Sequence, residues 1–168
     1  MTHQQLIDRT PIGWRDGIVL PLLLAFLWEF FVRQMVFGVQ KYSTADDLWE
    51  AIISIFPAQK LQRNWRGYQY IRLNFLGLEA VFLLLPPGST TSAHNHQSWL
   101  NPNFVLFGDV THTTFNIRNS KLKVAEELVI NQGHCQWLVK YQSHSIDVPP
   151  SASMPSVMLN LHFPARNL

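Results

Sequence analysis

Cysteine is almost absent from this chain of 168 residues, which holds a single thiol, Cys135. One cysteine excludes a disulfide within the chain and is typical of a reducing compartment, so we expect a cytoplasmic protein. Charge is also scarce, because only 14% of the residues are Asp, Glu, Lys or Arg and the net charge is +2. The sequence also contains no large cluster of Lys and Arg residues. We therefore expect no nucleic-acid partner.

Apolar residues are plentiful by contrast, at 47% of the sequence, and aromatic residues make up 12%. This composition excludes a disordered chain. The length suits one structural domain with a substantial buried core. Within it we expect an N-terminal helical segment over residues 1–66, packed outside a β-barrel formed by residues 67–168.

A long apolar run extends from Gly17 to Trp28 and ends at Glu29. It is too short to span a membrane, which takes roughly 20 residues, and it lacks the small-residue cleavage site of a signal peptide. We expect no membrane partner. We expect instead a helix over residues 18–37 that packs on the barrel or at a homodimer interface, with attachment to a membrane surface as the alternative.

A second helix is predicted between Thr44 and Pro57. Thr44 is a suitable N-cap, and Asp47 three residues later gives a variant of the capping box. Proline cannot continue a helix, so Pro57 predicts its end. The apolar residues between them recur at helical spacing, at Leu48, Ile52 and Ile55.

From about Tyr68 the apolar pattern changes to a period of two, which predicts strands. Ile71 and Leu73 fall on one face of the first strand, and Tyr70 and Arg72 on the other. Further strands are expected at 80–85, 104–109, 110–117, 122–130, 136–139 and 157–163. Many short strands with turns between them predict a mainly β fold, either a sandwich or a barrel.

Two histidines one residue apart, His94 and His96, follow the expected strand 80–85. On extended backbone they project to the same side. Two neutral imidazoles on one face are half of a coordination shell for a divalent transition metal. His144 lies far enough downstream to return on a later strand and complete it. We expect His3, His112 and His134 to be ordinary surface or core histidines.

The spacing around this pair resembles the first motif of the cupin superfamily. Gly88 and Gly108 flank His94-Asn95-His96 and would permit the turns that begin and end the metal-bearing hairpin. In that motif the position of Asn101 is usually a glutamate that also binds metal. The resemblance implies a cupin-type, jelly-roll-like β-barrel. The missing glutamate leaves three histidines as metal ligands.

Among cupins, residues from about 40 to 165 resemble the cysteine dioxygenase group, or thiol dioxygenases, which hold Fe(II) with three histidines. The resemblance implies that His94, His96 and His144 bind Fe(II), although imidazole also suits other divalent transition metals. Tyr70-Ile71-Arg72 is similar to the family's Tyr-x-Arg. This implies that Arg72 grips a substrate carboxylate, while Tyr70 binds substrate or takes part in catalysis.

The segment Asn160-Leu161-His162 is similar to the family's Ser-Leu-His, in which a serine, a histidine and a following tyrosine form a hydrogen-bonding relay beside the metal. The resemblance implies a catalytic role for His162. Asn160 replaces the serine of that relay, and Pro164 replaces its tyrosine. Asn101 cannot form the cysteine–tyrosine cross-link that some animal members carry at this position.

The resemblance implies an Fe(II) thiol dioxygenase. Its partners would be O2 and cysteine, or a similar small thiol that carries a carboxylate, and its product would be a sulfinic acid. The alternative is a non-catalytic cupin, or one of different activity, that binds a small ligand around a metal. The altered relay favours the alternative, whereas Arg72 and the three histidines favour the enzyme.

Overall fold

The structure is a computed structural model that describes most of the chain from residue 38 to residue 162. The described residues are 38–57, 59, 61–64, 66–75, 78–96, 98, 100–118, 121–139 and 142–162. The helix expected over 18–37 and the position of Pro164 lie outside them. In the part of the chain that the structure describes, no helix has the length and apolar character needed to cross a bilayer.

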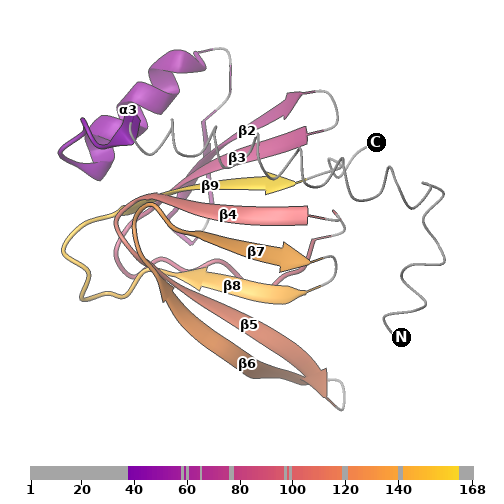
Figure 1. Cartoon of the computed structure of the whole chain (residues 1–168). Coiled ribbons are helices and arrows are strands. Elements are labelled where there is room, and N and C mark those ends of the chain that lie inside the picture. The colour runs from indigo at the N-terminus through magenta and orange to yellow at the C-terminus, as the bar shows by residue number, and fades with distance from the viewer. Residues whose placement is uncertain are drawn as a thin grey trace. The chain divides into compact units, whose positions relative to one another are not determined.

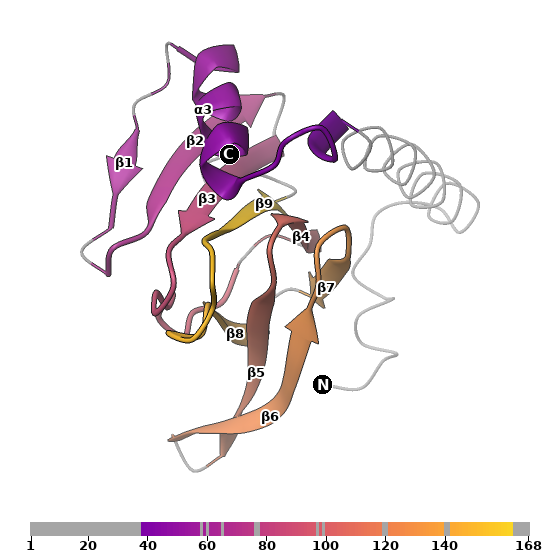
Figure 2. The same cartoon turned by 90° about the vertical axis from the view of Figure 1, so that its left-hand side faces the viewer.

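Antiparallel strands build most of the described structure, which confirms the mainly β prediction (Figure 1). The larger sheet has the order β1-β2-β3-β9-β4-β7 and the smaller one the order β6-β5-β8; both can be followed in Figure 2. The larger sheet consists of β1 (Gln62–Arg63), β2 (Gln69–Phe75), β3 (Leu78–Leu85), β9 (Ser156–His162), β4 (Leu100–Phe107) and β7 (Cys135–Val139). The smaller one consists of β6 (Lys121–Ile130), β5 (Val110–Arg118) and β8 (Ser143–Asp147).

Two strands begin earlier than the apolar pattern predicted. β3 starts at Leu78 and so includes Glu79, and β4 starts at Leu100 and so includes Asn101. Both polar residues are buried, at 2% and 0% exposure. They face the interior of the protein, and a polar side chain there breaks the alternation that marks a strand in the sequence.

β3 is apolar along most of its length because both of its faces are covered. Val81 and Leu83 belong to the main core cluster, together with Ile146 of β8 and Met158 of β9. On the opposite face, the ring of Phe82 lies 5.9 Å from that of Phe56, just past the end of the helix. Burial on both faces favours an apolar run over an alternating one.

The helix expected between Thr44 and Pro57 is present as α3 (Ala45–Ile55). Thr44 is its N-cap, and the Thr44 hydroxyl accepts a hydrogen bond from the Asp47 backbone N–H at 3.1 Å. Its buried face consists of Ala45, Leu48, Trp49 and Ile52. Residues from Val39 onward form one compact unit. The expected boundary between residues 66 and 67 stays a prediction.

The two glycines that flank the histidine pair occupy tight turns. Gly88 has a φ of +80° and Gly108 a φ of +71°, a region that other residues rarely adopt. Gly88 follows β3 and begins the segment that carries the histidines, while Gly108 joins β4 to β5. The structural role expected of both glycines is confirmed.

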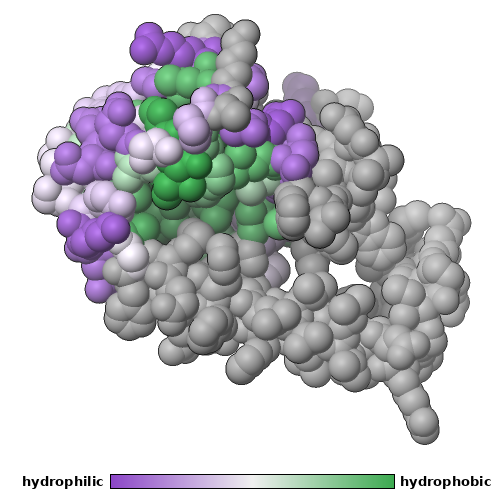
Figure 3. Space-filling model, turned by 90° about the horizontal axis from the view of Figure 1, so that it is seen from above, coloured by the Kyte–Doolittle hydropathy of each residue, from purple (hydrophilic) through white to green (hydrophobic). Residues whose placement is uncertain are grey.

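The described surface seen from above is apolar at its centre and hydrophilic around it (Figure 3). Elsewhere, β6 is exposed at all of its residues except Ile130 and is an edge strand of the smaller sheet. Exposed apolar side chains occur there at Val124 and Val129, at 62% and 68%.

Candidate metal centre

Three histidine side chains converge although they come from two distant parts of the chain. His94 and His96 belong to the segment that follows β3, and His144 to β8. One ring nitrogen from each can be chosen so that all three lie within 4.8 Å of one another. The segment of His94 and His96 was expected to have extended backbone, and in the structure it is not part of any named strand. It runs as a loop that isolated bridges fasten to β8, and one of these pairs His94 directly with His144.

The ring nitrogens of His96 and His144 have the separation that a shared metal ion requires. Their Nε2 atoms are 2.9 Å apart. Two imidazole nitrogens bound at right angles to one metal, each at about 2.1 Å, would be about 3 Å apart. Both rings are buried, at 2% and 0% exposure. The donor set and this distance therefore fit a divalent transition metal held by neutral imidazoles.

The surroundings of these rings also favour the form that binds metal. His94 Nδ1 lies 2.6 Å from the backbone oxygen of Ser92, so Nδ1 carries the proton and Nε2 carries the lone pair. Burial lowers the pKa of His144 far below its usual value, and the neighbouring histidines, first of all His94, lower it further. A neutral ring keeps a lone pair that a metal can use.

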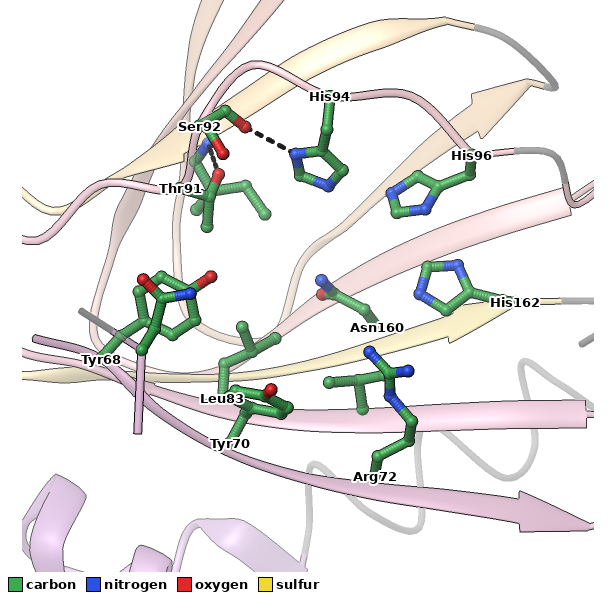
Figure 4. A pocket seen from close by; sticks show the side chains of 13 residues that line it. Tyr68, Tyr70, Arg72, Leu83, Thr91, Ser92, His94, His96, Asn160 and His162 are labelled. Atoms are coloured by element: carbon green, nitrogen blue, oxygen red, sulfur yellow. Dashed lines mark hydrogen bonds between the residues drawn. The ribbon is translucent and has the colours of Figure 1, made fainter. Parts of the chain in front are cut away.

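A cavity of about 310 Å³ opens beside the histidines. His94 and His96 line it (Figure 4), whereas His144 is not among its lining residues. Tyr70 and Arg72 of β2 line the same cavity from the larger sheet. The expected face of β2 thus points toward the metal centre. The volume is at the lower end of the roughly 300–1,000 Å³ that is usual for small-molecule sites.

Arg72 reaches into this cavity but also has a partner within the protein. Its Nε lies 3.2 Å from Oε1 of Glu79, whose side chain is only 2% exposed, while the Arg72 side chain is 39% exposed. The end of its guanidinium points toward Asn160 and the histidines (Figure 4). A buried carboxylate beside a guanidinium holds it in one orientation and offsets part of its charge.

The hydroxyl of Tyr70 already has a partner within the protein: it donates to Oε1 of Gln62, the residue opposite Tyr70 on β1. β1 was absent from the predicted strands, so this contact was not expected. The aromatic ring of Tyr70 lines the cavity and packs against the main core cluster. Its oxygen retains the capacity to accept a hydrogen bond from a ligand.

His162 has buried polar contacts next to the three converging histidines. Its ring lies 4.3 Å from that of His96, centroid to centroid. Its Nδ1 lies 2.9 Å from Oδ1 of Asn101, and since an amide oxygen only accepts, Nδ1 donates. The other nitrogen of His162, Nε2, is 3.9 Å from Oε2 of Glu79. The ion pair of Arg72 and Glu79 thus lies beside the hydrogen-bonded pair of His162 and Asn101.

The sequence interpretation overlooked two residues of this site. Glu79 lies on the same face of β3 as Val81 and Leu83, because residues two apart on a strand share a face. An acidic residue on the inward face of an apolar strand is a signal from which its role could have been predicted. His112, which we expected to be an ordinary histidine, is 1% exposed, and its Nε2 lies 2.9 Å from Nδ1 of His144. No local pattern marks His112, because its partner is 32 residues away.

Asn160 projects into the cavity from β9 (Figure 4). It is 6% exposed, and in the described part of the chain its Oδ1 has no hydrogen-bond partner. A buried acceptor without a partner is costly, so this oxygen is a place where a ligand that donates a hydrogen bond would be stabilised.

Comparison with known proteins finds similarity in structure and not in sequence. No family model and no curated protein sequence matches the chain. KdgF from Halomonas sp. is similar over 66% of this chain and 93% of its own, with a TM-score of 0.53 and 17% identity. An RmlC-like cupin from Shewanella frigidimarina covers 66% of this chain and 88% of its own, with a TM-score of 0.50 and 18% identity.

Oxalate decarboxylase of Lactobacillus farciminis is similar over 66% of this chain and 32% of its own, with a TM-score of 0.55 and 14% identity. At these identities the similarity concerns the fold alone. Together with the two antiparallel sheets and the converging histidines, it shows that the described part of this chain has the cupin fold.

Proposed function

We propose that this protein is an Fe(II)-dependent thiol dioxygenase that acts on cysteine or a similar small thiol carrying a carboxylate. The reaction would combine one thiol, R–SH, with one O2 to give the sulfinic acid R–SO2H, which balances without a further reductant. One observation carries the proposal: three imidazoles meet beside a cavity that a guanidinium also lines. A bound ferrous ion would supply the redox chemistry that joins the thiol to dioxygen.

Arg72 would bind the substrate carboxylate. Its Nε lies beside Glu79, so the other guanidinium nitrogens are the ones that face the cavity. Arginine and a carboxylate form a strong, directional, charge-assisted pair. Glu79 fixes the orientation of the guanidinium before the substrate arrives, which reduces the entropy lost on binding.

Asn160 would favour a substrate with a hydrogen-bond donor near its carboxylate. Its unpartnered Oδ1 points into the cavity between the histidines and Arg72. An α-ammonium group is such a donor. A hydrogen bond from this ammonium group to Asn160 would favour cysteine over a thiol that has a carboxylate but no amine.

Tyr70 and His162 would act by positioning. The phenol of Tyr70 is tied to Gln62 and forms part of the cavity wall near Arg72. His162 packs on the ring of His96 and is itself held by Asn101. Both side chains therefore restrict where the substrate and one metal ligand can lie.

The alternative is a metal-containing cupin that binds a small ligand without oxidising it. The pairing of Arg72 with Glu79 favours this alternative, because a guanidinium with a buried carboxylate beside it attracts an anionic substrate less strongly. The presence of Asn160 in place of the relay serine also favours this alternative.

Metal analysis combined with oxygen uptake tests the proposal. We expect about one iron per chain after anaerobic loading. Oxygen should then be consumed with cysteine, more slowly with 3-mercaptopropionate, which lacks the amine, and hardly with cysteamine, which lacks the carboxylate. Serine should give no uptake. An iron-loaded protein that consumes no oxygen with any of these thiols would favour the binding module.

A variant pair separates substrate recognition from a general effect of charge. We expect Arg72→Gln to lower kcat/KM for cysteine roughly 10- to 100-fold, mainly through KM, because it removes a charge-assisted contact. Arg63→Gln, at an exposed arginine of β1, removes the same charge and should leave the kinetics unchanged. Equal effects of both variants would contradict the role of Arg72.

A further inference from the structure

An additional histidine extends the metal centre away from the cavity. His112 lies on β5, the strand that pairs with β8, and its cross-strand neighbour is Ile146. Its ring centroid is 5.0 Å from that of His144, and the two rings are tilted by 35°. His112 Nε2 lies 2.9 Å from His144 Nδ1, on the opposite side of the His144 ring from the nitrogen that faces His96.

The contact between His112 and His144 has two alternative proton arrangements. If His112 donates from Nε2, neutral His144 must carry its proton on Nε2, and that nitrogen has no lone pair for a metal. If His144 donates from Nδ1, its Nε2 keeps the lone pair and faces His96. Only the second arrangement leaves the three-histidine site complete.

We propose that His112 is a positioning residue of the metal centre: its Nε2 accepts the Nδ1 proton of His144 and thereby presents Nε2 of His144 to the metal. This inference depends on the metal binding proposed above. Partners of this kind fix both the tautomer and the orientation of a ligating histidine, and their loss typically lowers metal affinity about 10- to 100-fold.

The burial of this pair makes the hydrogen bond selective. His112 is 1% exposed and His144 is 0% exposed, so water does not compete for either nitrogen. In the described part of the chain, His112 Nδ1 has no hydrogen-bond partner. The imidazole chain therefore ends at His112, and the proton on its Nδ1 has no acceptor to which it could pass.

Zinc affinity, measured by competition with a chelator, tests the proposal in three variants. His112→Leu removes the acceptor, and we expect its affinity to fall about 10- to 100-fold. His112→Gln can place Oε1 near the position of the lost Nε2, and we expect an affinity within about threefold of the wild type. His134→Leu makes the same change at an exposed histidine and should leave the affinity unchanged.

Long-range ¹H–¹⁵N spectra of the zinc-loaded wild type test the same inference without a variant. They should show His112 protonated on Nδ1 and His144 protonated on Nδ1 with its Nε2 bound to zinc. A proton on Nε2 of His112, or an equal loss of affinity in the Leu and Gln variants, would overturn the proposed role. A wild type that binds no zinc or other divalent metal would instead overturn the proposed function.

Discussion

At the scale of single residues, burial decides the chemistry of this site more than residue type does. The sequence contains seven histidines. His96, His144 and His112 are buried, whereas His134 is exposed and His94 is intermediate. Burial removes hydration from the charged form of an imidazole and so favours the neutral ring. Neutral rings are the ones that bind transition metals, so the packing around His144 and His112 prepares the site before any ion arrives.

The pH dependence of stability follows from this burial. Burial lowers the pKa of His112 from 6.5 to about 4, with a smaller lowering by His94 and an opposing effect of Asp147. Between pH 6.5 and about 4, the unfolded chain binds a proton at His112 and the folded chain does not. The contribution of His112 to the free energy of unfolding is therefore complete above pH 6.5 and is lost as the pH falls toward 4. The loss is on the order of 3 kcal/mol.

Urea unfolding of the metal-free protein between pH 4 and 7.5, in the presence of a chelator, measures this dependence. We expect the free energy of unfolding to fall steeply below pH 6.5 in the wild type and less steeply in His112→Gln. The variant His134→Gln, at an exposed position, should retain the wild-type slope. A free energy that does not depend on pH across this window would show that His112 titrates alike in both states.

At the scale of elements, the turns and the loop between strands place the ligands. Gly108 ends β4 and allows β5 to turn back, which brings His112 beside β8. The loop that carries His94 and His96 is fastened to β8 by backbone hydrogen bonds, among them His144 N–H to the oxygen of His94 at 2.8 Å and Thr91 N–H to the oxygen of Ile146 at 2.8 Å. A metal bound by the three histidines would add a further link between this loop and β8.

Replacement of Gly108 by alanine tests how strictly this turn is required. An added Cβ would lie 2.7 Å from Oγ of Ser156 and 3.0 Å from the backbone oxygen of Pro155, at a φ of +71°. The positive φ alone costs about 1–2 kcal/mol for a residue with a side chain. The clash adds to that cost, so we expect a total loss of roughly 2–4 kcal/mol in chemical denaturation.

Gly67 provides the matched control. It also has a positive φ, of +92°, but an added Cβ would meet no atom within 4 Å. Gly67→Ala should therefore lose only the stability that the positive φ costs, about 1–2 kcal/mol. Equal losses at the two positions would mean that the contact with Ser156 and Pro155 relaxes without cost.

At the scale of the whole molecule, the metal centre joins parts that are distant in sequence. His96 and His144 are 48 residues apart, and their ring nitrogens lie 2.9 Å from each other. Any ligand that binds the folded chain but not the unfolded one stabilises it. A metal at this centre should therefore raise the stability of the entire cupin unit.

Thermal unfolding with and without zinc measures this coupling. At a zinc concentration about 100 times Kd, we expect a stabilisation of about 2.7 kcal/mol and thus a rise in Tm of roughly 5–10 °C. His96→Ala should abolish most of that rise, whereas His134→Ala should retain it. The same Tm rise in both variants would place the zinc somewhere other than at the three histidines.

Much of this protein could be predicted from local pattern. The capped helix ending before Pro57, the alternation in β2 and the two glycines with positive φ depend on neighbouring residues, and all three are confirmed. Strand boundaries at Glu79 and Asn101 could not be predicted, because a buried polar side chain interrupts the apolar pattern, and a partner such as His162 for Asn101 is not marked in the sequence. β8 was missing from the predicted strands although His144 was expected to lie on one, since its five residues have no apolar alternation to mark them.

The sequence alone determined the class of fold and marked His94 and His96 as candidate metal ligands, because periodicity, turn residues and the spacing of these histidines are local properties. The tertiary structure alone decided which groups meet. It placed Glu79 beside Arg72, His112 behind His144 and Gln62 at Tyr70. The physical reason is that hydrogen bonds and burial form between side chains that the folded backbone brings together. The spacing along the chain does not mark such a partner, whether it is near, as Arg72 is to Glu79, or 32 residues away, as His144 is from His112.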